Sequence, residues 1–358
     1  MFALDFFCGA GGLTRGFLNV GIKVVAGIDV DEGCRRTYEE NNAPARFVAC
    51  DLREMTRQDV AALVDGIPPD LLVFAACAPC QPFSKQRRVV GDRRDRTLLG
   101  AFSALVAEFR PRFVVVENVP GIVRVPGNST YRRLLSRLES LGYSVAEGRS
   151  DSKFFGVPQT RCRWLVLAAL GVQAALPPRT HGPGGLPYCT VREAIYGYPR
   201  IQAGSTDPTV PNHRAAGLSD LNLRRLRATP QDGGGRLHWP RSLALPCHSE
   251  NYDGHTDVYG RMRWDAPAPA LTCRCVSLSN GRYGHPEQDR AISVREAARL
   301  QSFEDDFIFY GPSMGALAAQ IGNAVPVKLG EAIGEQILRL AGVGAREARL
   351  QEDHSFAP

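Results

Sequence analysis

The chain has 358 residues, of which 44% are hydrophobic and 22% are charged, and this composition is typical of a globular protein of about two domains. No apolar run approaches the roughly 18 residues that a membrane-spanning helix needs, and Met1 leads directly into a strand-like segment instead of a signal sequence, so we expect an intracellular protein. The formal net charge is +6, and all but four of the 43 basic residues are arginine, which permits a nucleic-acid partner without requiring one.

The ten cysteines are expected to be reduced, because disulfides are rare in intracellular proteins and the spacings are mostly irregular. Two closer pairs, Cys77 with Cys80 and Cys273 with Cys275, are weak zinc signals because no regular partner pair follows either of them. We therefore expect no metal site.

The N-terminal segment predicts a strand over residues 2–7, a glycine-rich turn over 8–12 and a helix over 13–20. A turn without side chains lets a ligand approach the backbone, and the helix that follows presents free N–H groups. A simple tight turn would use the same residues, so the glycines alone leave both interpretations open.

The next two predicted strands, residues 23–28 and 46–50, end in Asp29 and Asp51. Doubly wound folds place an acid about 20 residues beyond the glycines, where it accepts hydrogen bonds from ribose hydroxyls. The second acid could accept a hydrogen bond from an exocyclic amine. Together, these strand ends predict a cofactor that contains a nucleoside.

A continuous apolar run over residues 71–76 predicts a central strand that is covered on both faces. It leads into Cys80, which stands between Pro79 and Pro82. Ligands of such sheets bind just beyond the carboxyl ends of the strands, and the prolines stiffen the backbone there. Cys80 is therefore a candidate nucleophile, with a structural turn around a partly buried cysteine as the alternative.

A basic segment follows the candidate nucleophile. Between Lys85 and Arg96 there are six basic and two acidic residues. This charge suits contacts with phosphate, although a solvated charged loop has the same composition.

The fifth predicted strand, residues 113–116, leads into Glu117. A carboxyl at this edge of the sheet suits proton donation or the anchoring of a protonated ring nitrogen, unless it caps a helix or turn. Further on, Arg161 and Arg163 precede a strand over residues 164–170 and share one face of it because they are two residues apart. Two guanidinium groups on one face suit a phosphate or a base oxygen.

Residues 175–281 are rich in glycine, proline, histidine and arginine. Zinc binding or pH switching by the histidines is one interpretation, but they keep no ligand spacing, and a loop-rich inserted module fits better. Helices are predicted again over residues 292–300, where Ser293 and Glu296 stand in capping-box register, and over 327–340.

The chain contains five short motifs: Asp5-Phe6-Phe7-Cys8-Gly9-Ala10-Gly11-Gly12, Pro79-Cys80-Gln81, Glu117-Asn118-Val119, Gln159-x-Arg161-x-Arg163 and Gly322-Asn323-x-Val325. In this order they resemble the motifs of the DNA cytosine-5 methyltransferases, and the resemblance runs from Asp5 to about Leu340 with the exception of the insert. Each motif is weak alone, but five in order at family-like spacing are specific. There are small departures: Cys77-Ala78 stands where glycine followed by proline or phenylalanine is usual, and Glu304 where proline is common.

The resemblance implies an α/β fold, the Rossmann-like fold of S-adenosylmethionine-dependent methyltransferases, with a small, loop-rich target-recognition domain inserted. The catalytic domain would comprise residues 1–175 and 282–345, the target-recognition domain 176–281, and a C-terminal tail 346–358. S-adenosylmethionine would be the cofactor and S-adenosylhomocysteine its product. Phe7 would lie against the adenine, Asp29 on the ribose and Asp51 near the adenine amine. The full set of implied cofactor residues is Phe7, Gly9, Gly11, Gly12, Asp29, Val30, Asp51, Leu52, Pro79, Asn323 and Val325.

The resemblance also implies the chemistry. The target cytosine would leave the duplex, and the Cys80 thiolate would add to its carbon 6, which makes carbon 5 nucleophilic enough to take a methyl group. Glu117 would hold ring nitrogen 3 and the exocyclic amine, Arg163 would contact the base oxygen, and Arg161 would hold the active-site loop or a phosphate. Gln81 completes the implied catalytic set.

DNA contacts are expected from two regions. The basic segment would contribute Ser84, Lys85, Arg87 and Arg88, with the basic side chains on phosphates. The insert would read base edges in the major groove, and its residues of suitable type are Arg236, His238, Arg261 and Arg263.

The implied partner is double-stranded DNA that carries a specific short sequence, with a cognate restriction endonuclease encoded nearby as a second partner. A monomer in the cytoplasm of a prokaryote or phage host, near the nucleoid and away from membranes, is the expected setting. Two alternatives remain open. A transfer-RNA cytosine-5 methyltransferase would have similar catalytic motifs, but the insert lacks the Cys-Phe-Thr signature of that branch. A non-catalytic DNA-binding regulator would not need Cys80, Glu117 and Asn323 together.

Overall fold

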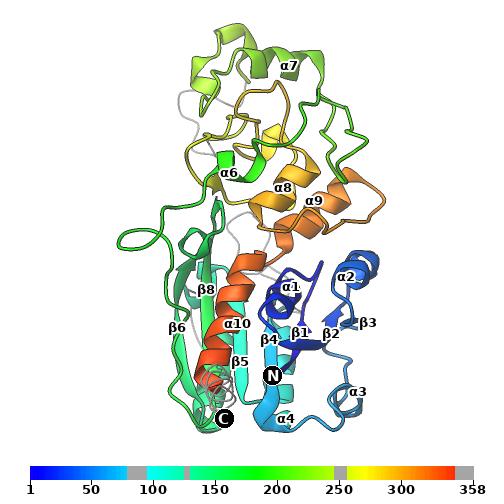
Figure 1. The fold of residues 1–358 in the computed structure, drawn as a ribbon, viewed down its shortest axis with the longest axis vertical. Coiled ribbons are helices and arrows are strands. Elements are labelled where there is room, and N and C mark those ends of the chain that lie inside the picture. Colours follow the sequence, from blue (N-terminus) through cyan, green and yellow to red (C-terminus); the bar gives the residue numbers. More distant parts are fainter. Residues whose placement is uncertain (79–94, 125–129, 246–255, 343–358) are drawn as a thin grey trace, which may run out of the picture. The chain divides into compact units, whose positions relative to one another are not determined.

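The chain folds into two compact units. The structure, a computed structural model, describes residues 1–78, 95–124, 130–245 and 256–342. The first unit comprises residues 1–151, 162–179 and those from 327 onwards, and the second comprises residues 152–161 and 180–326. Figure 1 shows the elements of each unit, coloured along the sequence. No helix of the described residues is both long and apolar enough to cross a membrane.

A seven-stranded sheet lies at the centre of the first unit, in the order β3-β2-β1-β4-β5-β8-β6. The five strands from β3 to β5 are parallel, whereas β8 runs antiparallel to both of its neighbours. The predicted α/β fold with a doubly wound sheet is confirmed. The strands are β1 (Phe2–Phe6), β2 (Lys23–Asp29), β3 (Arg46–Ala49), β4 (Leu72–Ala76), β5 (Phe113–Asn118), β6 (Ser144–Asp151) and β8 (Cys162–Ala169).

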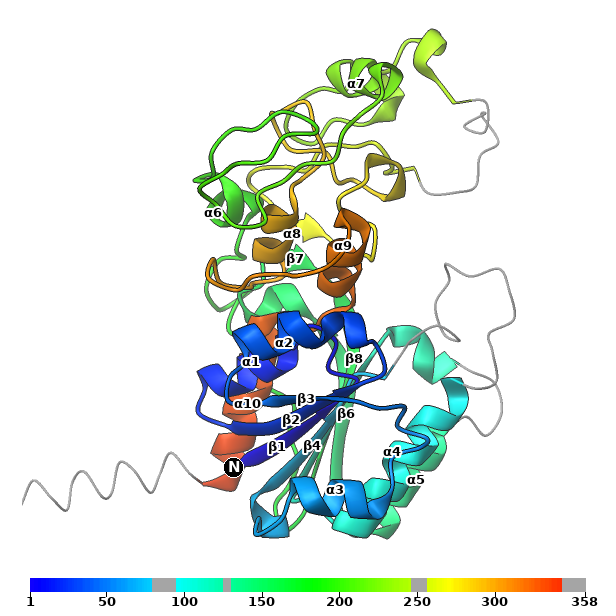
Figure 2. The same ribbon diagram turned by 90° about the vertical axis from the view of Figure 1, so that its right-hand side faces the viewer.

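Helices cover both faces of this sheet, as Figure 2 shows. Because β4 and β5 are thus covered on both sides, every residue in them is buried, which explains the continuous apolar runs in the sequence. On one face lie α1 (Gly12–Asn19), α2 (Arg35–Asn41) and α10 (Val327–Ala341), and on the other lie α3 (Arg57–Leu63), α4 (Asp95–Phe109) and α5 (Thr130–Ser140).

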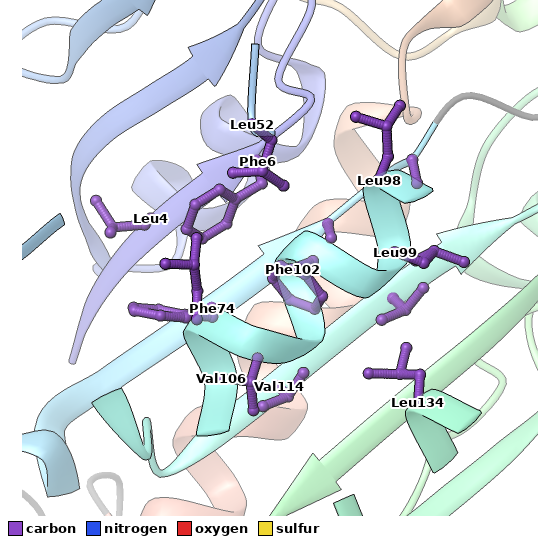
Figure 3. Packing of buried hydrophobic residues seen from close by; sticks show 14 of the residues in the cluster. Leu4, Phe6, Leu52, Phe74, Leu98, Leu99, Phe102, Val106, Val114 and Leu134 are labelled. Atoms are coloured by element: carbon purple, nitrogen blue, oxygen red, sulfur yellow. The ribbon is translucent and has the colours of Figure 1, made fainter. Parts of the chain in front are cut away.

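The main hydrophobic core fills the space between the sheet and the second group of helices (Figure 3). Phe6 of β1 is at its centre, with its ring centroid 5.3 Å from that of Phe74 on β4 and 5.4 Å from that of Phe102 on α4, both edge to face. Such aromatic pairs add to the free energy that burial of their area already contributes. The core therefore fixes the central strands at the point where they lead into the edge loops.

Glycines allow α1 and α10 to pack very closely. A Cβ atom at Gly16 would lie 2.5 Å from the carbonyl oxygen of Val327, and one at Gly330 would lie 3.2 Å from that of Leu13. Both neighbours are backbone atoms, which cannot move aside without shifting a helix. The contact attaches the C-terminal helix to the helix that follows the glycine-rich turn.

The second unit consists mostly of loops. Its two short strands, β7 (Gln159–Thr160) and β9 (Ala268–Pro269), pair in parallel. Its helices are α6 (Val191–Ile195), α7 (Asp220–Arg227), α8 (Val294–Leu300) and α9 (Met314–Asn323). Ser293 and Glu296 form the predicted capping box at the start of α8.

Buried arginines stabilise these loops. Among the described residues, Arg261, Arg290 and Arg295 are the bulkiest of the fully buried side chains. Arg295 donates to the carbonyl oxygens of Pro211, Glu304 and Phe307 at 2.9 to 3.0 Å. Loops lack the ladder hydrogen bonds of a sheet, so their buried carbonyls need donors of this kind.

The second unit is larger than the predicted insert of residues 176–281, because it includes residues 282–326 and 152–161 as well. Hydrogen bonds across the predicted boundary explain this: Arg295 of α8 binds the carbonyl of Pro211, and Arg261 binds that of His285. The predicted division into a catalytic and a target-recognition domain concerns function and stays a prediction.

The close contact between α1 and α10 predicts opposite effects for two helix glycines. Gly16→Ala should lower the free energy of unfolding by about 1 to 3 kcal/mol, because its methyl group would meet packed backbone. The matched control is Gly100→Ala in α4, where a Cβ would meet no atom within 4 Å; it should raise the free energy of unfolding by about 0.5 to 1 kcal/mol. Urea unfolding of both variants measures this, and equal effects would contradict the proposed close contact.

Candidate active site at the edge of the sheet

One edge of the sheet collects most of the predicted site residues of the first unit. The carboxyl ends of the parallel strands meet there, and because β8 is antiparallel, its first residues enter at the same edge. In parallel α/β sheets ligands bind at this edge. It brings together the segments that contain Phe7, Asp29, Asp51, Glu117 and Arg163.

Three residues in the segment that follows β1, through the glycine-rich turn, have a left-handed backbone conformation. Phe7, Gly9 and Gly11 have φ angles of 63°, 51° and 88°. For phenylalanine this left-handed conformation is strained, and such strain is typical of functional sites. Gly12 begins α1. A Cβ at Gly11 would lie 2.4 Å from Asn42 Nδ2 and 2.8 Å from the Tyr38 ring, whereas one at Gly9 would meet nothing within 4 Å. The turn is thus packed beneath Gly11 and open above Gly9.

Asp29 connects the end of β2 to this turn. Its Oδ2 accepts a hydrogen bond of 2.8 Å from Gly9 N, and its Oδ1 accepts one of 2.9 Å from Asp31 N. Burial raises the pKa of Asp29, and these backbone donors act in the opposite direction. The next residue, Val30, is apolar and yet 71% exposed. An acceptor beside an exposed apolar side chain suits a ligand with hydroxyls and a flat apolar ring.

The end of β3 differs in part from the expectation. Asp51 is paired with Arg53, whose Nε lies 2.9 Å from Oδ1 and 3.1 Å from Oδ2, and these hydrogen bonds hold the pKa of Asp51 below its usual value. Leu52 was predicted to contact the cofactor, but its side chain is buried in the main core. Any contact from Leu52 must therefore come from its backbone.

Asp5 is a buried acid beneath the glycine-rich turn, and the family resemblance assigned no role to it. Asp5 Oδ2 accepts a hydrogen bond of 2.7 Å from Thr14 Oγ1, so the hydroxyl of Tyr38, 3.0 Å from the same Oγ1, must donate to it. Asp5 Oδ1 is buried and has no partner among the described residues. Burial is the main cause that raises the pKa of Asp5 from 3.8 to about 7.

Glu117 and Arg163 meet at the sheet edge, a contact that the sequence did not predict. Glu117 on β5 stands opposite Leu165 on β8, so Arg163, two residues away, shares its face. Arg163 Nε lies 3.0 Å from Glu117 Oε1. This contact lacks hydrogen-bond geometry, and Oε1 has no hydrogen-bond partner among the described residues. The site therefore holds a buried carboxylate oxygen, beside a guanidinium, that can still accept a hydrogen bond.

Asn118 connects Glu117 to the predicted nucleophile segment. Its Nδ2 donates to the carbonyl oxygen of Ala78 at 3.0 Å, and its Oδ1 accepts from Val119 N at 2.8 Å. Ala78 is the last described residue before the motif. Several predicted site residues lie outside the described residues, and their roles stay predictions: Pro79, Cys80, Gln81, Ser84, Lys85, Arg87 and Arg88.

Arg161 does not share the surroundings of Arg163. It is buried in the second unit and donates to the carbonyl oxygens of Leu271, Gly322 and Ala324 at 2.8 to 3.2 Å. A contact with phosphate does not fit this burial, so the structure corrects that part of the expectation. Arg161 instead orders the segment that contains the Gly322-Asn323 motif.

Two further predicted cofactor residues, Asn323 and Val325, belong to the second unit. Val325 is buried, whereas Asn323 is exposed and accepts a hydrogen bond of 2.9 Å from the Cys273 thiol. Their place beside a cofactor stays a prediction.

Arg261 was predicted to read DNA, and the structure contradicts this. Its side chain is 1% exposed, and the five N–H groups of a guanidinium find five acceptors, so none is left for a base. The acceptors are the carbonyl oxygens of Thr229, His285, Gln288 and Leu226 and the carboxylate of Asp289. By contrast, Arg263 and His238 are exposed and Arg236 is half-buried.

The histidines and cysteines give no metal site among the described residues, where no three His, Cys, Asp or Glu side chains could hold an ion together. Burial lowers the pKa of His285 to about 3, so this ring is neutral and accepts hydrogen bonds from Glu287 N and Gln288 N. His213 is fully buried between Ser293 Oγ and the carbonyl of Pro199. Both histidines support the loops of the second unit.

Comparisons with known proteins agree on one family. A family model described as C-5 cytosine-specific DNA methylase matches residues 1–339. The Type II methylase M.HgiDII of Herpetosiphon aurantiacus is 39% identical over 350 residues, which cover 96% of this chain and 97% of that protein. The Type II methyltransferase M1.HphI of Haemophilus parahaemolyticus is 30% identical over 341 residues, 94% of this chain and 86% of that protein.

Solved structures show the same fold. A putative DNA modification methyltransferase encoded within a prophage of E. coli has a TM-score of 0.74 at 21% identity and covers 95% of this chain and 99% of its own. The Dnmt2 methyltransferase of S. pombe has a TM-score of 0.64 at 16% identity over 95% and 98% of the two chains. At such identities the likeness concerns the fold alone.

The buried Asp5 predicts a characteristic pH dependence of stability. Its pKa is about 7 in the folded chain and 3.8 ordinarily, so between these values the folded protein keeps a proton that the unfolded chain has lost. Rising pH should therefore lower the free energy of unfolding by up to about 1.4 kcal/mol per pH unit through this group.

Asp5→Asn removes the titration, so the stability of the variant relative to the wild type should rise as the pH increases through this window and then level off above it. Urea unfolding of both proteins at several pH values measures the difference. Parallel pH profiles would show that Asp5 does not titrate in this range.

Proposed function

The chain belongs to the C-5 cytosine-specific DNA methylase family, and from this premise we propose the cofactor, the residues and the setting of its reaction. It is a methyltransferase that acts on carbon 5 of cytosine in DNA, and its relatives M.HgiDII and M1.HphI are Type II enzymes of restriction-modification systems. The observation that supports the site best is the buried Glu117 carboxylate beside Arg163, near the end of β5, where the next residue, Asn118, donates a hydrogen bond to the carbonyl oxygen of Ala78.

S-adenosylmethionine is the proposed cofactor, held by the ends of β1, β2 and β3. The residues present fit it: Gly9 leaves open space at the turn, Asp29 offers carboxylate oxygens for ribose hydroxyls, and Val30 exposes an apolar surface for the adenine. Asp51 lies at the next strand end, where it can accept from the adenine amine. When bound, the cofactor supplies the methyl group and leaves as S-adenosylhomocysteine. Phe7 would lie against the adenine as well, and Gly11 and Gly12 shape the turn around the cofactor.

The Glu117 carboxylate is the proposed anchor for the flipped cytosine. Its Oε1 is buried and open to a donor, and the protonated ring nitrogen 3 and the exocyclic amine of cytosine are donors of the right kind. Arg163, whose Nε lies 3.0 Å from the same oxygen, offers N–H groups to the base oxygen. This pair would distinguish cytosine from bases with other patterns of donors and acceptors.

Cys80 is the proposed nucleophile. Its thiolate adds to carbon 6 of the cytosine, while Glu117 accepts hydrogen bonds from the protonated nitrogen 3 and the exocyclic amine, so that the electron pair displaced by the addition is received by a protonated ring. The electron pair then available at carbon 5 forms the bond to the methyl group. Removal of the carbon 5 proton by a base restores the ring double bond, breaks the bond between sulfur and carbon 6, and releases the thiolate. Gln81 follows the nucleophile, and Pro79 precedes it.

The recognition of DNA is assigned to the basic segment and to the second unit. Ser84, Lys85, Arg87 and Arg88 would bind phosphates next to the target base. Arg236, His238 and Arg263 are the candidate DNA-contacting residues of the second unit that the structure leaves fully or partly exposed. Asn323 and Val325 would complete the cofactor side.

We further propose that the methylation protects DNA from a cognate restriction endonuclease, and that the enzyme acts as a monomer in the cytoplasm of a prokaryote. The names of its relatives support the first proposal. A transfer-RNA substrate has no such support, because the insert lacks the Cys-Phe-Thr signature. A non-catalytic regulator would not need the Glu117 and Arg163 pair.

Exchange of the base anchor tests the site directly. Glu117→Gln keeps the size of the side chain but removes the charge, so the rate of methyl transfer should fall by about 100-fold or more while DNA affinity changes little. Bisulfite sequencing of DNA treated with wild-type protein and cofactor first identifies the target, and incorporation of labelled methyl groups then gives the rates.

The matched control is Glu139→Gln on the exposed side of α5, which should methylate like the wild type. Equal rates for Glu117→Gln and the control would remove Glu117 from the mechanism. If the wild type methylates no cytosine, the proposed cofactor or substrate is wrong.

A further inference from the structure

Leu237 is an apolar side chain held out into water. It is 91% exposed, and it stands in the turn formed by residues 233–239, which we call the Leu237 turn. Single exposed leucines are common on protein surfaces and require no explanation by themselves. What distinguishes this one is how firmly the surrounding turn is fixed on both sides.

The first half of the turn is fixed by hydrogen bonds to its carbonyls. Arg282 Nη1 donates to the carbonyl oxygens of Gly233 and Gly234, both at 2.9 Å, and Arg261 N donates to that of Gly234 at 3.0 Å. A Cβ at Gly234 would lie 2.2 Å from the carbonyl oxygen of Pro230, so only glycine fits there. The backbone leading to Leu237 is therefore part of the packed interior.

The second half of the turn is fixed by Trp239. Its Nε1 donates to Thr229 Oγ1 at 2.8 Å, and its ring meets that of Tyr259 edge to face at 5.4 Å. The guanidinium of Arg225 lies 5.5 Å from the Trp239 ring centroid. Trp239 thus packs against the small apolar cluster of the second unit that includes Leu226 and Tyr259.

Arginine and histidine flank Leu237 in the sequence, and the exposed Asp232 precedes the turn. Arg236 and His238 flank Leu237 in a short 3-10 helix, and no acidic residue occurs between positions 233 and 245. Arg263 packs against the turn, since a Cβ at Gly233 would lie 2.5 Å from its Cγ, and it is exposed. A positive surface with one apolar projection matches DNA, which combines phosphates with apolar groove surfaces.

We propose that the Leu237 turn is a preformed DNA-reading element, in which Leu237 contacts base pairs inside a groove while Arg236 and Arg263 bind the flanking phosphates. This rests on the proposed function, which assigns target recognition to the second unit. The rigidity of the turn means that little conformational freedom is lost on binding. Leu237 carries sequence discrimination, and the arginines carry the general electrostatic attraction.

The two kinds of contact respond differently to salt, and this separates them. Leu237→Ala should weaken binding to the methylation target by on the order of tenfold, with the same dependence of affinity on salt as the wild type. Its affinity for an unrelated duplex should not change. Arg236→Gln should weaken binding to both duplexes and reduce the salt slope by about one. Fluorescence anisotropy with labelled duplexes over a range of salt concentrations measures all four quantities.

Leu186→Ala is the matched control, because Leu186 is another leucine of the second unit that is 61% exposed in a turn; it should bind like the wild type. Two outcomes would overturn the proposal: wild-type affinity of Leu237→Ala for the target, or an equal loss on both duplexes. A lower melting temperature of Leu237→Ala would point to a structural role and contradict it as well. Failure of the wild type to methylate DNA would instead refute the proposed function.

Discussion

A sheet that is covered on both faces can hold polar side chains only where its strands end. Every residue of β4 and β5 is buried, so the functional groups described in the first unit gather at the carboxyl edge, where Asp29 and Glu117 lie. The antiparallel β8 adds Arg163 to the same edge because it starts there. Asp5 is the exception, since it lies within β1, where burial raises its pKa.

The second unit meets the opposite constraint. With few strands and short helices, it has many buried carbonyls that no ladder satisfies, and arginine side chains supply the missing donors. Arg261 alone donates hydrogen bonds to five acceptors, and Arg161 orders the Gly322 to Ala324 segment in the same way. An arginine-rich sequence therefore reflects loop architecture in this unit as well as a DNA partner.

These two constraints explain which features the sequence could predict. The central strands and their polar ends follow from continuous apolar runs, whereas the pairing of Glu117 with Arg163 was not predicted, because it depends on the antiparallel placement of β8 beside β5. The edge strand β6 was not predicted because it is largely polar and partly exposed. Helix α9 was not predicted, because it has only ten residues and its glycines at positions 315 and 322 weaken the helical pattern. The sequence did not show that the side chain of Leu52 is buried in the core, because a residue next to a strand end can turn its side chain either way.

The second unit was less predictable because burial there depends on contacts between distant segments. Nothing local distinguishes Arg261 from Arg263, two residues apart, yet one is internal and the other exposed. The unit also extends beyond the predicted insert, since Arg295 of α8 binds loop carbonyls more than eighty positions earlier in the chain. Leu237 belongs to no recognisable sequence motif, and only its exposure and the fixed turn around it distinguish it from other leucines.

The proposed mechanism depends on the attack of Cys80 on a cytosine that is presented to the edge of the sheet. The most direct measurement uses DNA with 5-fluorocytosine at the methylated position, because fluorine at carbon 5 cannot leave as a proton does and the enzyme stays bound to carbon 6. In the presence of cofactor, denaturing electrophoresis should show a covalent complex for the wild type and none for Cys80→Ala. A wild-type enzyme that methylates the cytosine form of this target but forms no covalent complex with the fluorinated form would contradict the attack of Cys80 on carbon 6.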